Sequence, residues 1–167
     1  MTACAVTKEP DTPLYLEKSA CIGKVPVPLY RDYDPKTHDL GSSAADMLTA
    51  LDTAAMRALE PMDVSYASMT LAQLGFAPDK EPSFEEVRNR VQEIGGRSCH
   101  ELLALPVWNE PFGGTHGRFL MYPVDVEGDP LVFEIHQDTG RRSLRGISLK
   151  RVRHWRFDLP VIFQIGA

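Results

Sequence analysis

The sequence predicts an α+β fold, with three to four helices packed on one face of a C-terminal antiparallel meander of four to five strands. Apolar residues recur at helical spacing before residue 105, and they alternate with polar residues after residue 117. Two short turn sequences, at 127–129 and 138–140, divide the alternating part, and connections of this length join antiparallel strands.

The length of 167 residues fits one domain, 1–167, that can bury a core without metals or disulfides. Within it we expect an irregular or extended segment at 1–40, a helical part at 42–105 and the antiparallel sheet at 117–166. The expected sheet and helices therefore follow one another along the chain instead of alternating.

Start and stop residues mark the first two predicted helices. Ser43 opens a run whose apolar side chains share one face until Pro61 ends it. Asp63 can cap a second helix, which Gly75 terminates.

Two further helices are predicted from the capping-box pattern, in which a Ser is followed three residues later by a Glu. Ser83 and Glu86 begin one of them, and Ser98 and Glu101 begin a short one before Pro106.

The alternating part divides into strands that we expect at 118–126, 130–137, 141–149 and 150–165. Successive side chains on a strand point to opposite faces. Helices need an apolar sheet face to cover, so Trp155, Phe157 and Leu159 of the last strand are predicted to point into the core.

The apolar fraction of 43% and the charged fraction of 25% are typical of a soluble globular protein. No apolar run approaches the roughly 18 residues of a membrane span, and the N-terminus lacks the features of a secretory signal. We therefore expect a cytoplasmic protein without a membrane partner. The three cysteines form no C-x-x-C pair and no cluster with histidines at zinc spacing, so neither a metal nor a cofactor is predicted.

The net charge of −5 conceals a local asymmetry. Residues 141–157 contain seven Lys or Arg and no acid, whereas residues 1–140 contain eleven basic and twenty-two acidic residues. Charge of one sign within a short segment creates a local field. We expect this segment to provide a binding surface through the residues Arg141, Arg142, Arg145, Lys150, Arg151 and Arg153.

The same alternation places Glu134 and His136 on one face of the second strand, and His154 and Arg156 on that face of the last strand. A Glu and a His can act as base and acid in metal-independent RNA cleavage, while Arg stabilises the phosphorane-like transition state. The alternative without catalysis is a solvated sheet face on which Glu134 pairs with an Arg of a neighbouring strand.

A second candidate chemistry involves Cys99, which follows the expected helix cap near Arg97. A helix N-terminus and a neighbouring cation lower a thiol pKa. With His116 as the base and Asp125 as its partner, this arrangement suggests a cysteine hydrolase. Only seventeen positions separate Cys99 from His116, and a buried structural cysteine is the alternative.

The function that we favour from the sequence is a small, cofactor-free protein–protein interaction module of the inhibitor, immunity or adaptor type. Its basic C-terminal hairpin and acidic body would orient an oppositely patterned protein partner. A metal-independent endoribonuclease is the alternative, with RNA or another phosphate-bearing ligand as its partner. A cysteine hydrolase comes third.

Overall fold

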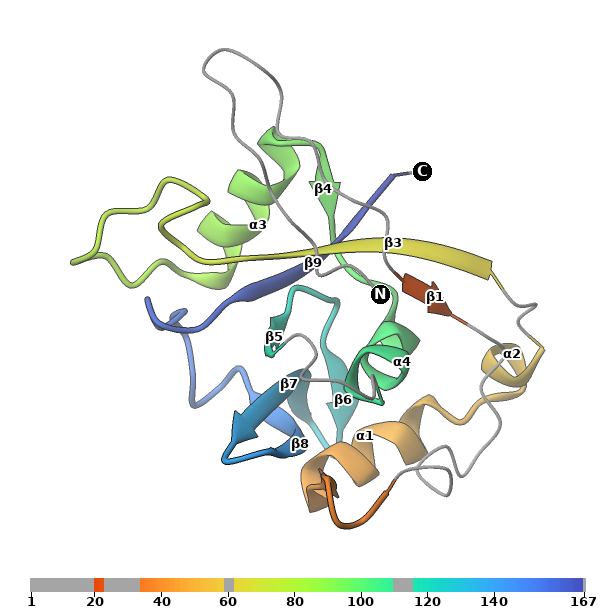
Figure 1. The fold of residues 1–167 in the computed structure, drawn as a ribbon. Coiled ribbons are helices and arrows are strands. Elements are labelled where there is room, and N and C mark those ends of the chain that lie inside the picture. Colours follow the sequence, from red (N-terminus) through yellow and green to blue (C-terminus); the bar gives the residue numbers. More distant parts are fainter. Residues whose placement is uncertain (1–19, 23–33, 59–61, 110–115, 167) are drawn as a thin grey trace.

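The computed structural model describes residues 20–22, 34–58, 62–109 and 116–166 (Figure 1). Its strands are β1 (Ala20–Ile22), β2 (His38–Leu40), β3 (Met62–Met69), β4 (Gly96–Arg97), β5 (Gly117–Phe119), β6 (Val124–Val126), β7 (Asp129–Asp138), β8 (Arg141–Ser148) and β9 (Val161–Ile165). They form one nine-stranded sheet of the order β1-β3-β9-β5-β7-β8-β2, in which β4 also pairs with β9 and β6 with β7. The helices are α1 (Ser42–Leu51), α2 (Ala54–Arg57), α3 (Phe84–Glu93), the 3-10 helix η2 (Glu101–Leu103) and α4 (Ala104–Trp108).

The mixed content of helices and strands agrees with the predicted class, but the sheet is not purely antiparallel. β2 pairs with β8 in parallel, and β5 pairs with β9 in parallel. The first four strands precede residue 117, where the expected sheet begins, so the sheet is also larger than the expected meander. Alternation within the C-terminal half could not reveal these partners, because they lie far away in the sequence.

Helices cover both faces of the sheet, contrary to the prediction that they pack on one face. α3 lies on the opposite side of β3 and β9 from α1 and α4 (Figure 1). One buried cluster contains Met47 of α1 and Trp108 of α4, and the other contains Val87 and Val91 of α3. The central strand β9 is buried along its whole length, because each face of it packs on a different cluster.

The predicted helix that begins at Asp63 is wrong, since residues 62–69 form β3. β3 pairs with β9 through residues 65–69 and with β1 through residues 62–64. The apolar residues Val64, Ala67 and Leu71 do recur at helical spacing, but Tyr66 and Met69 are buried as well. A strand that has partners on both edges and is covered on both faces buries its odd-numbered and its even-numbered side chains. Its sequence therefore lacks the alternation of apolar and polar residues that identifies a strand.

Other local signals behave as predicted. Ser83 and Glu86 form the reciprocal capping box of α3. The turns 127–128 and 139–140 have positive φ at both residues and join β6 to β7 and β7 to β8 as antiparallel pairs. The first predicted helix is interrupted, because Asp52 ends α1 and the side chain of Thr53 caps α2.

The last predicted strand is mostly a loop, since β8 ends at Ser148 and β9 begins at Val161. This β8–β9 loop (residues 149–160) is held from outside the sheet. The backbone N–H of Trp155 donates to the carbonyl of Pro82 over 2.7 Å, and the Trp155 side chain is fully buried in the α3-side cluster. Phe157 and Leu159 are only partly buried. The segment therefore contacts the residues just before α3 and is not a strand of the sheet. The alternation of side chains that the sequence predicts for it does not apply.

The predicted irregular segment 1–40 contains the two short strands β1 and β2, while residues 1–19 and 23–33 lie outside the described part. No helix in the described ranges is both long enough and apolar enough to cross a membrane.

Candidate functional site

Three charged residues stand side by side across the sheet on the face that the β8–β9 loop crosses. Arg118 of β5 is the register partner of Glu134 of β7, and Glu134 is the partner of Arg145 of β8. Directly opposed residues of paired strands project to the same face. The sheet therefore presents a row of positive, negative and positive groups, which we call the charged row.

Glu134 is bound to Arg118 and is not a free carboxylate. Its Oε2 accepts hydrogen bonds from Nε and Nη2 of Arg118, over 3.0 and 2.9 Å. The two side chains are only 12% and 4% exposed, respectively. A carboxylate that two charged donors hold in a buried position serves the structure, because these hydrogen bonds fix its orientation.

The β8–β9 loop closes over this ion pair. The guanidinium of Arg118 lies 5.3 Å from the centre of the Trp155 ring, and its Nη1 donates to the carbonyl of His154 over 3.5 Å. Arg118 thus joins β7 to the loop. Arg118 is not among the site residues predicted from the sequence, because its pairing with Glu134 depends on the strand register and not on a local pattern.

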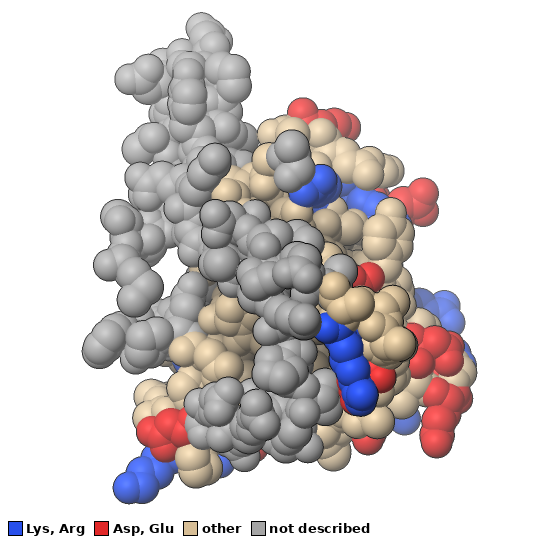
Figure 2. All heavy atoms as spheres, turned by 90° about the vertical axis from the view of Figure 1, so that its right-hand side faces the viewer, with Lys and Arg blue, Asp and Glu red and all other residues tan. Residues whose placement is uncertain are grey.

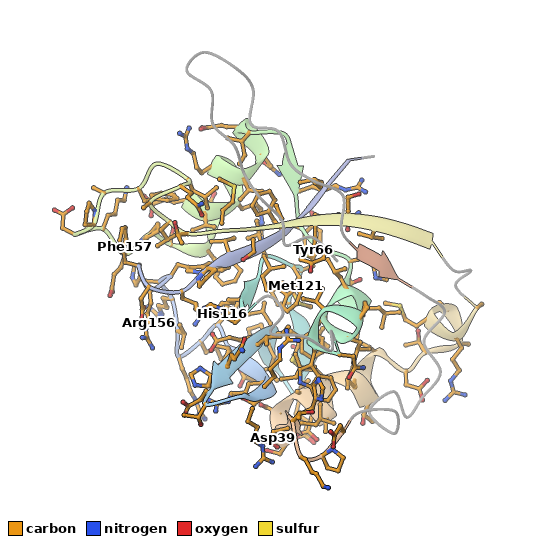
Figure 3. All side chains as sticks on the ribbon, viewed as in Figure 1. Asp39, Tyr66, His116, Met121, Arg156 and Phe157 are labelled. Carbon is orange, nitrogen blue, oxygen red and sulfur yellow. The ribbon has the colours of Figure 1, made fainter. Side chains whose placement is uncertain are left out.

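The predicted catalytic residues His154 and Arg156 lie on this loop, and each contacts a group other than Glu134. Nδ1 of His154 lies 3.2 Å from the carbonyl oxygen of Glu81. Arg156 donates to both carboxylate oxygens of Asp158, over 3.0 and 2.6 Å. In Figure 3, Arg156 and Phe157 lie together on the left side of the molecule. The loop brings these residues near the charged row, but it does not join them into one hydrogen-bonded network with Glu134.

Electrostatics does link Arg156 to Glu134. The hydrogen bond and then the charge of Asp158 raise the pKa of Arg156, and Glu134 and Glu81 add to this effect. The same contact with Arg156 lowers the pKa of Asp158. Arg156 is exposed, so these are weak, solvent-screened interactions.

His136 is the predicted site residue that is most available to a ligand. It lies two residues beyond Glu134 on β7, on the same face, opposite Ser143 of β8. Its side chain is exposed and makes no hydrogen bond or ion pair within the described part of the chain. His136 and Arg145 are therefore diagonal neighbours beside the charged row, at a separation that long side chains can bridge.

Three of the predicted basic binding residues have structural contacts. Arg142 is 4% exposed and donates from Nη1 and Nη2 to the carbonyls of Trp108 and Val107, each over 2.9 Å, at the C-terminal end of α4. Lys150 donates to the carbonyl of Gly128 in the turn between β6 and β7. Arg141 is exposed and lies 4.0 Å from a carboxylate oxygen of Asp39.

The other three, Arg145, Arg151 and Arg153, are exposed and form no ion pair or hydrogen bond through their side chains within the described residues. We call them the free arginines. Elsewhere the surface is mixed, and Figure 2 shows a face on which described basic and acidic side chains lie among uncharged ones. The free arginines, together with His136, are the predicted site residues that remain available for binding.

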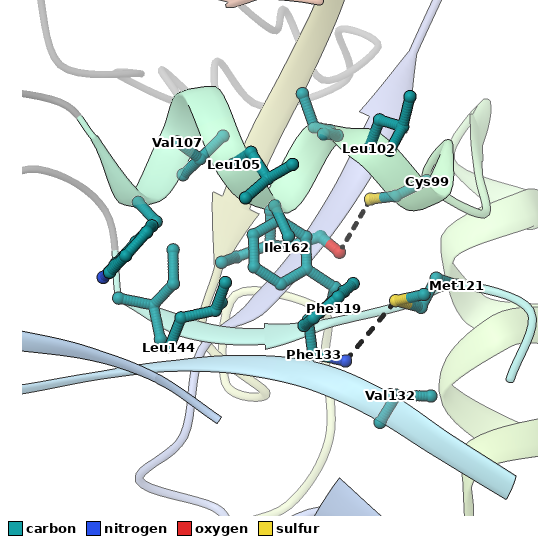
Figure 4. Close-up of a cluster of buried hydrophobic side chains, with 14 of the residues drawn as sticks. Cys99, Leu102, Leu105, Val107, Phe119, Met121, Val132, Phe133, Leu144 and Ile162 are labelled. Carbon is teal, nitrogen blue, oxygen red and sulfur yellow. Dashed lines mark hydrogen bonds between the residues drawn. The ribbon is translucent and has the colours of Figure 1, made fainter. Parts of the chain in front are cut away.

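Cys99 is buried in the core, 3% exposed, and donates a hydrogen bond from Sγ to the carbonyl of Ile162 over 3.3 Å (Figure 4). Burial strongly raises the pKa of its thiol. The cap of the following helix is His100, not Ser98, so Cys99 lacks the helix N-terminus that the sequence suggested. His116, directly before β5, is exposed (Figure 3). These features give no support to a reactive thiolate at Cys99.

Among the described residues, no group of three or more His, Cys, Asp or Glu side chains is arranged to hold a metal ion. No family model matches the chain, and no curated protein and no solved structure is significantly similar to it.

Proposed function

We propose that this protein is a small protein–protein interaction module whose contact surface includes the free arginines on the β8 strand and the β8–β9 loop. The observation that carries the proposal is their availability. Arg145, Arg151 and Arg153 are exposed and unpaired within the described part of the chain, whereas Glu134, Arg156 and Cys99 are each held by a contact inside the protein.

The rigid attachment of this surface favours a binding role. Trp155 and the Arg118–Glu134 pair fix the loop that carries Arg151 and Arg153. A surface that is ordered before binding loses less conformational entropy on association. Exposed charges of one sign also increase the association rate with a partner of opposite charge.

The test compares two variants that change the charge equally. R151E/R153E reverses two free arginines, and K36E/R97E reverses two other exposed basic residues of the described chain that have no ion pair there. Each variant and the wild-type protein is cross-linked in a lysate of its host, captured and quantified by mass spectrometry. We expect partners that the wild type and K36E/R97E recover equally and that R151E/R153E loses. Equal recovery by all three proteins, or recovery of no partner, would overturn the proposal.

A second candidate function, a metal-independent endoribonuclease, is favoured by one specific observation. His136 and Arg145 flank Glu134 on one sheet face, and the charge of Glu134 also reaches Arg156. A His can take the proton of the 2′-hydroxyl and pass it to the leaving 5′-oxygen, while an Arg stabilises the phosphorane-like transition state.

Cleavage of a fluorogenic RNA in the presence of a chelator tests this candidate. The variant H136A should abolish the cleavage, while Q137A, which changes the adjacent exposed residue on the other face of β7, should retain it. Absence of cleavage by the wild-type protein, or equal cleavage by both variants, would rule this function out.

A further inference from the structure

Tyr122 lies in a backbone bulge between β5 and β6, and it is the exposed large hydrophobic residue among those described, at 64%. The register shows the bulge, because β5 pairs Arg118 with Glu134 whereas β6 pairs Val124 with Leu131. Three more residues are present on the β5–β6 side than on β7, and the extra chain turns Tyr122 toward solvent.

Internal contacts hold the backbone of this bulge. Cys99 donates its N–H to the carbonyl of Leu120 over 2.6 Å, and Cys99 forms a parallel bridge with Met121. Sδ of Met121 also accepts a hydrogen bond from the N–H of Phe133 over 3.4 Å (Figure 4). Leu120 and Met121 are fully buried, so Tyr122 is presented from a rigid base.

Arg88 of α3 lies over the ring of Tyr122, with its guanidinium carbon 5.6 Å from the ring centre. Arg88 is half-buried, and among the described residues no carboxylate forms an ion pair with it. Its Nε is shielded by the protein, so an external acceptor can reach the terminal nitrogens of the guanidinium and not Nε. A carboxylate is the acceptor that matches the paired donors of a guanidinium.

We propose that Tyr122 and Arg88 form the anchor point for an acidic segment of a protein partner. A carboxylate of that segment pairs with Arg88, while its neighbouring side chain packs on the Tyr122 ring. Tyr and Arg are the residue types that most often dominate the binding energy of protein interfaces. The inference rests on the proposed interaction function and adds to it a contact point and the chemistry of the partner.

Charge complementarity supports an acidic occupant. His154 forms a bridge with Ser83, directly before α3, and Trp155 contacts Phe84 in the first turn of α3. This places the loop that carries Arg151 and Arg153 on the same side of the sheet as Arg88. Arg151 and Arg153 are exposed and without an ion pair among the described residues, so this side of the molecule carries cations besides Arg88.

The test uses a labelled ten-residue oligoglutamate peptide that ends in one Phe, and a ten-nucleotide oligouridylate as the alternative probe. Binding is followed by NMR through the Arg88 Nε–Hε and Tyr122 amide signals of the full chain. We expect the peptide to shift both signals, and R88K and Y122S each to weaken binding roughly ten-fold, as expected at a dominant contact. R88K keeps the charge but lacks the planar fork. R97Q, which removes an exposed arginine of β4, is the matched control and should bind like the wild type.

Unchanged thermal unfolding of R88K and Y122S establishes that both variants remain folded. If the peptide shifts other residues only, or if the oligouridylate shifts both signals and the peptide does not, the inference is wrong. The capture experiment separates this failure from that of the proposed function. A partner that R151E/R153E loses but R88K and Y122S retain supports the interaction function and overturns the anchor.

Discussion

Arg118 and Glu134 face each other across β5 and β7 and form a buried ion pair with two hydrogen bonds to a single carboxylate oxygen. The pair also fixes the β8–β9 loop, through the carbonyl of His154 and the ring of Trp155. This buried ion pair therefore positions the loop that carries two of the proposed binding residues.

Removing one member of this pair should destabilise the protein. E134Q leaves the Arg118 charge buried without a counter-charge, and we expect the free energy of unfolding to fall by about 3–5 kcal/mol. Replacing both residues, in R118M/E134L, should recover most of this loss, because no buried charge is left unpaired. Urea unfolding of the single and double variants measures the coupling. A double variant that loses the sum of the two single losses would contradict the assignment.

Arg142 and Arg145 both belong to the predicted basic surface, but we expect their substitutions to act differently. R142Q removes charged hydrogen bonds to the carbonyls at the end of α4 and should cost about 2–3 kcal/mol of stability. R145Q changes an exposed side chain and should alter stability by less than about 0.5 kcal/mol. Thermal and urea unfolding check both values. Equal losses would show that Arg145 also has a structural role.

Glu86 should make stability depend on pH in the acidic range. Hydrogen bonds from Lys80 and from the N–H of Ser83 lower its pKa from 4.5 to about 2. Because the pKa is lower in the folded protein, the stabilisation is complete above pH 4.5 and is lost as the pH falls toward about 2. Urea midpoints of the wild type should therefore exceed those of E86Q at neutral pH and approach them at low pH. A difference that does not change with pH would contradict this role.

Gly117 should resist substitution more strongly than Gly128, although both have positive φ. A Cβ at position 117 would lie 2.5 Å from the carbonyl oxygen of Pro160, whereas nothing lies within 4 Å of one at position 128. We expect G117A to cost about 1–3 kcal/mol more than G128A, because the close approach of β5 to the start of β9 adds to the backbone strain. Similar unfolding midpoints for the two variants would show that this approach is not tight.

The local features could be predicted from the sequence because neighbouring residues determine them. The capping box of Ser83 and Glu86 and the Gly-containing turns at 127–128 and 139–140 are hydrogen-bonding and backbone preferences of a few residues. The burial of Trp155 was also anticipated, although the reason was wrong, because its position comes from a loop contact with Pro82 and not from strand alternation.

The candidate site could be predicted only in part, because local patterns determine only some of its contacts. Glu134 and His136 lie on one face of β7, as alternation predicts, since the period of a strand is a local property. Three other contacts depend on partners between 16 and 35 residues away in the sequence. Arg118 pairs with Glu134, Arg142 donates to the carbonyl of Val107 in α4, and Arg88 lies over the ring of Tyr122. No pattern within a short window contains these contacts.

By itself the sequence determined the capped helix α3, the two tight hairpins and a concentration of positive charge in residues 141–157. The tertiary structure decided which of these charges are available. Long-range pairing made β3 a strand, placed helices on both faces of the sheet and buried Arg142 and Arg118 while Arg145, Arg151 and Arg153 stayed exposed. The physical reason is that burial and ion pairing depend on which distant segments meet, whereas caps and turns depend on the free energy of a few adjacent residues.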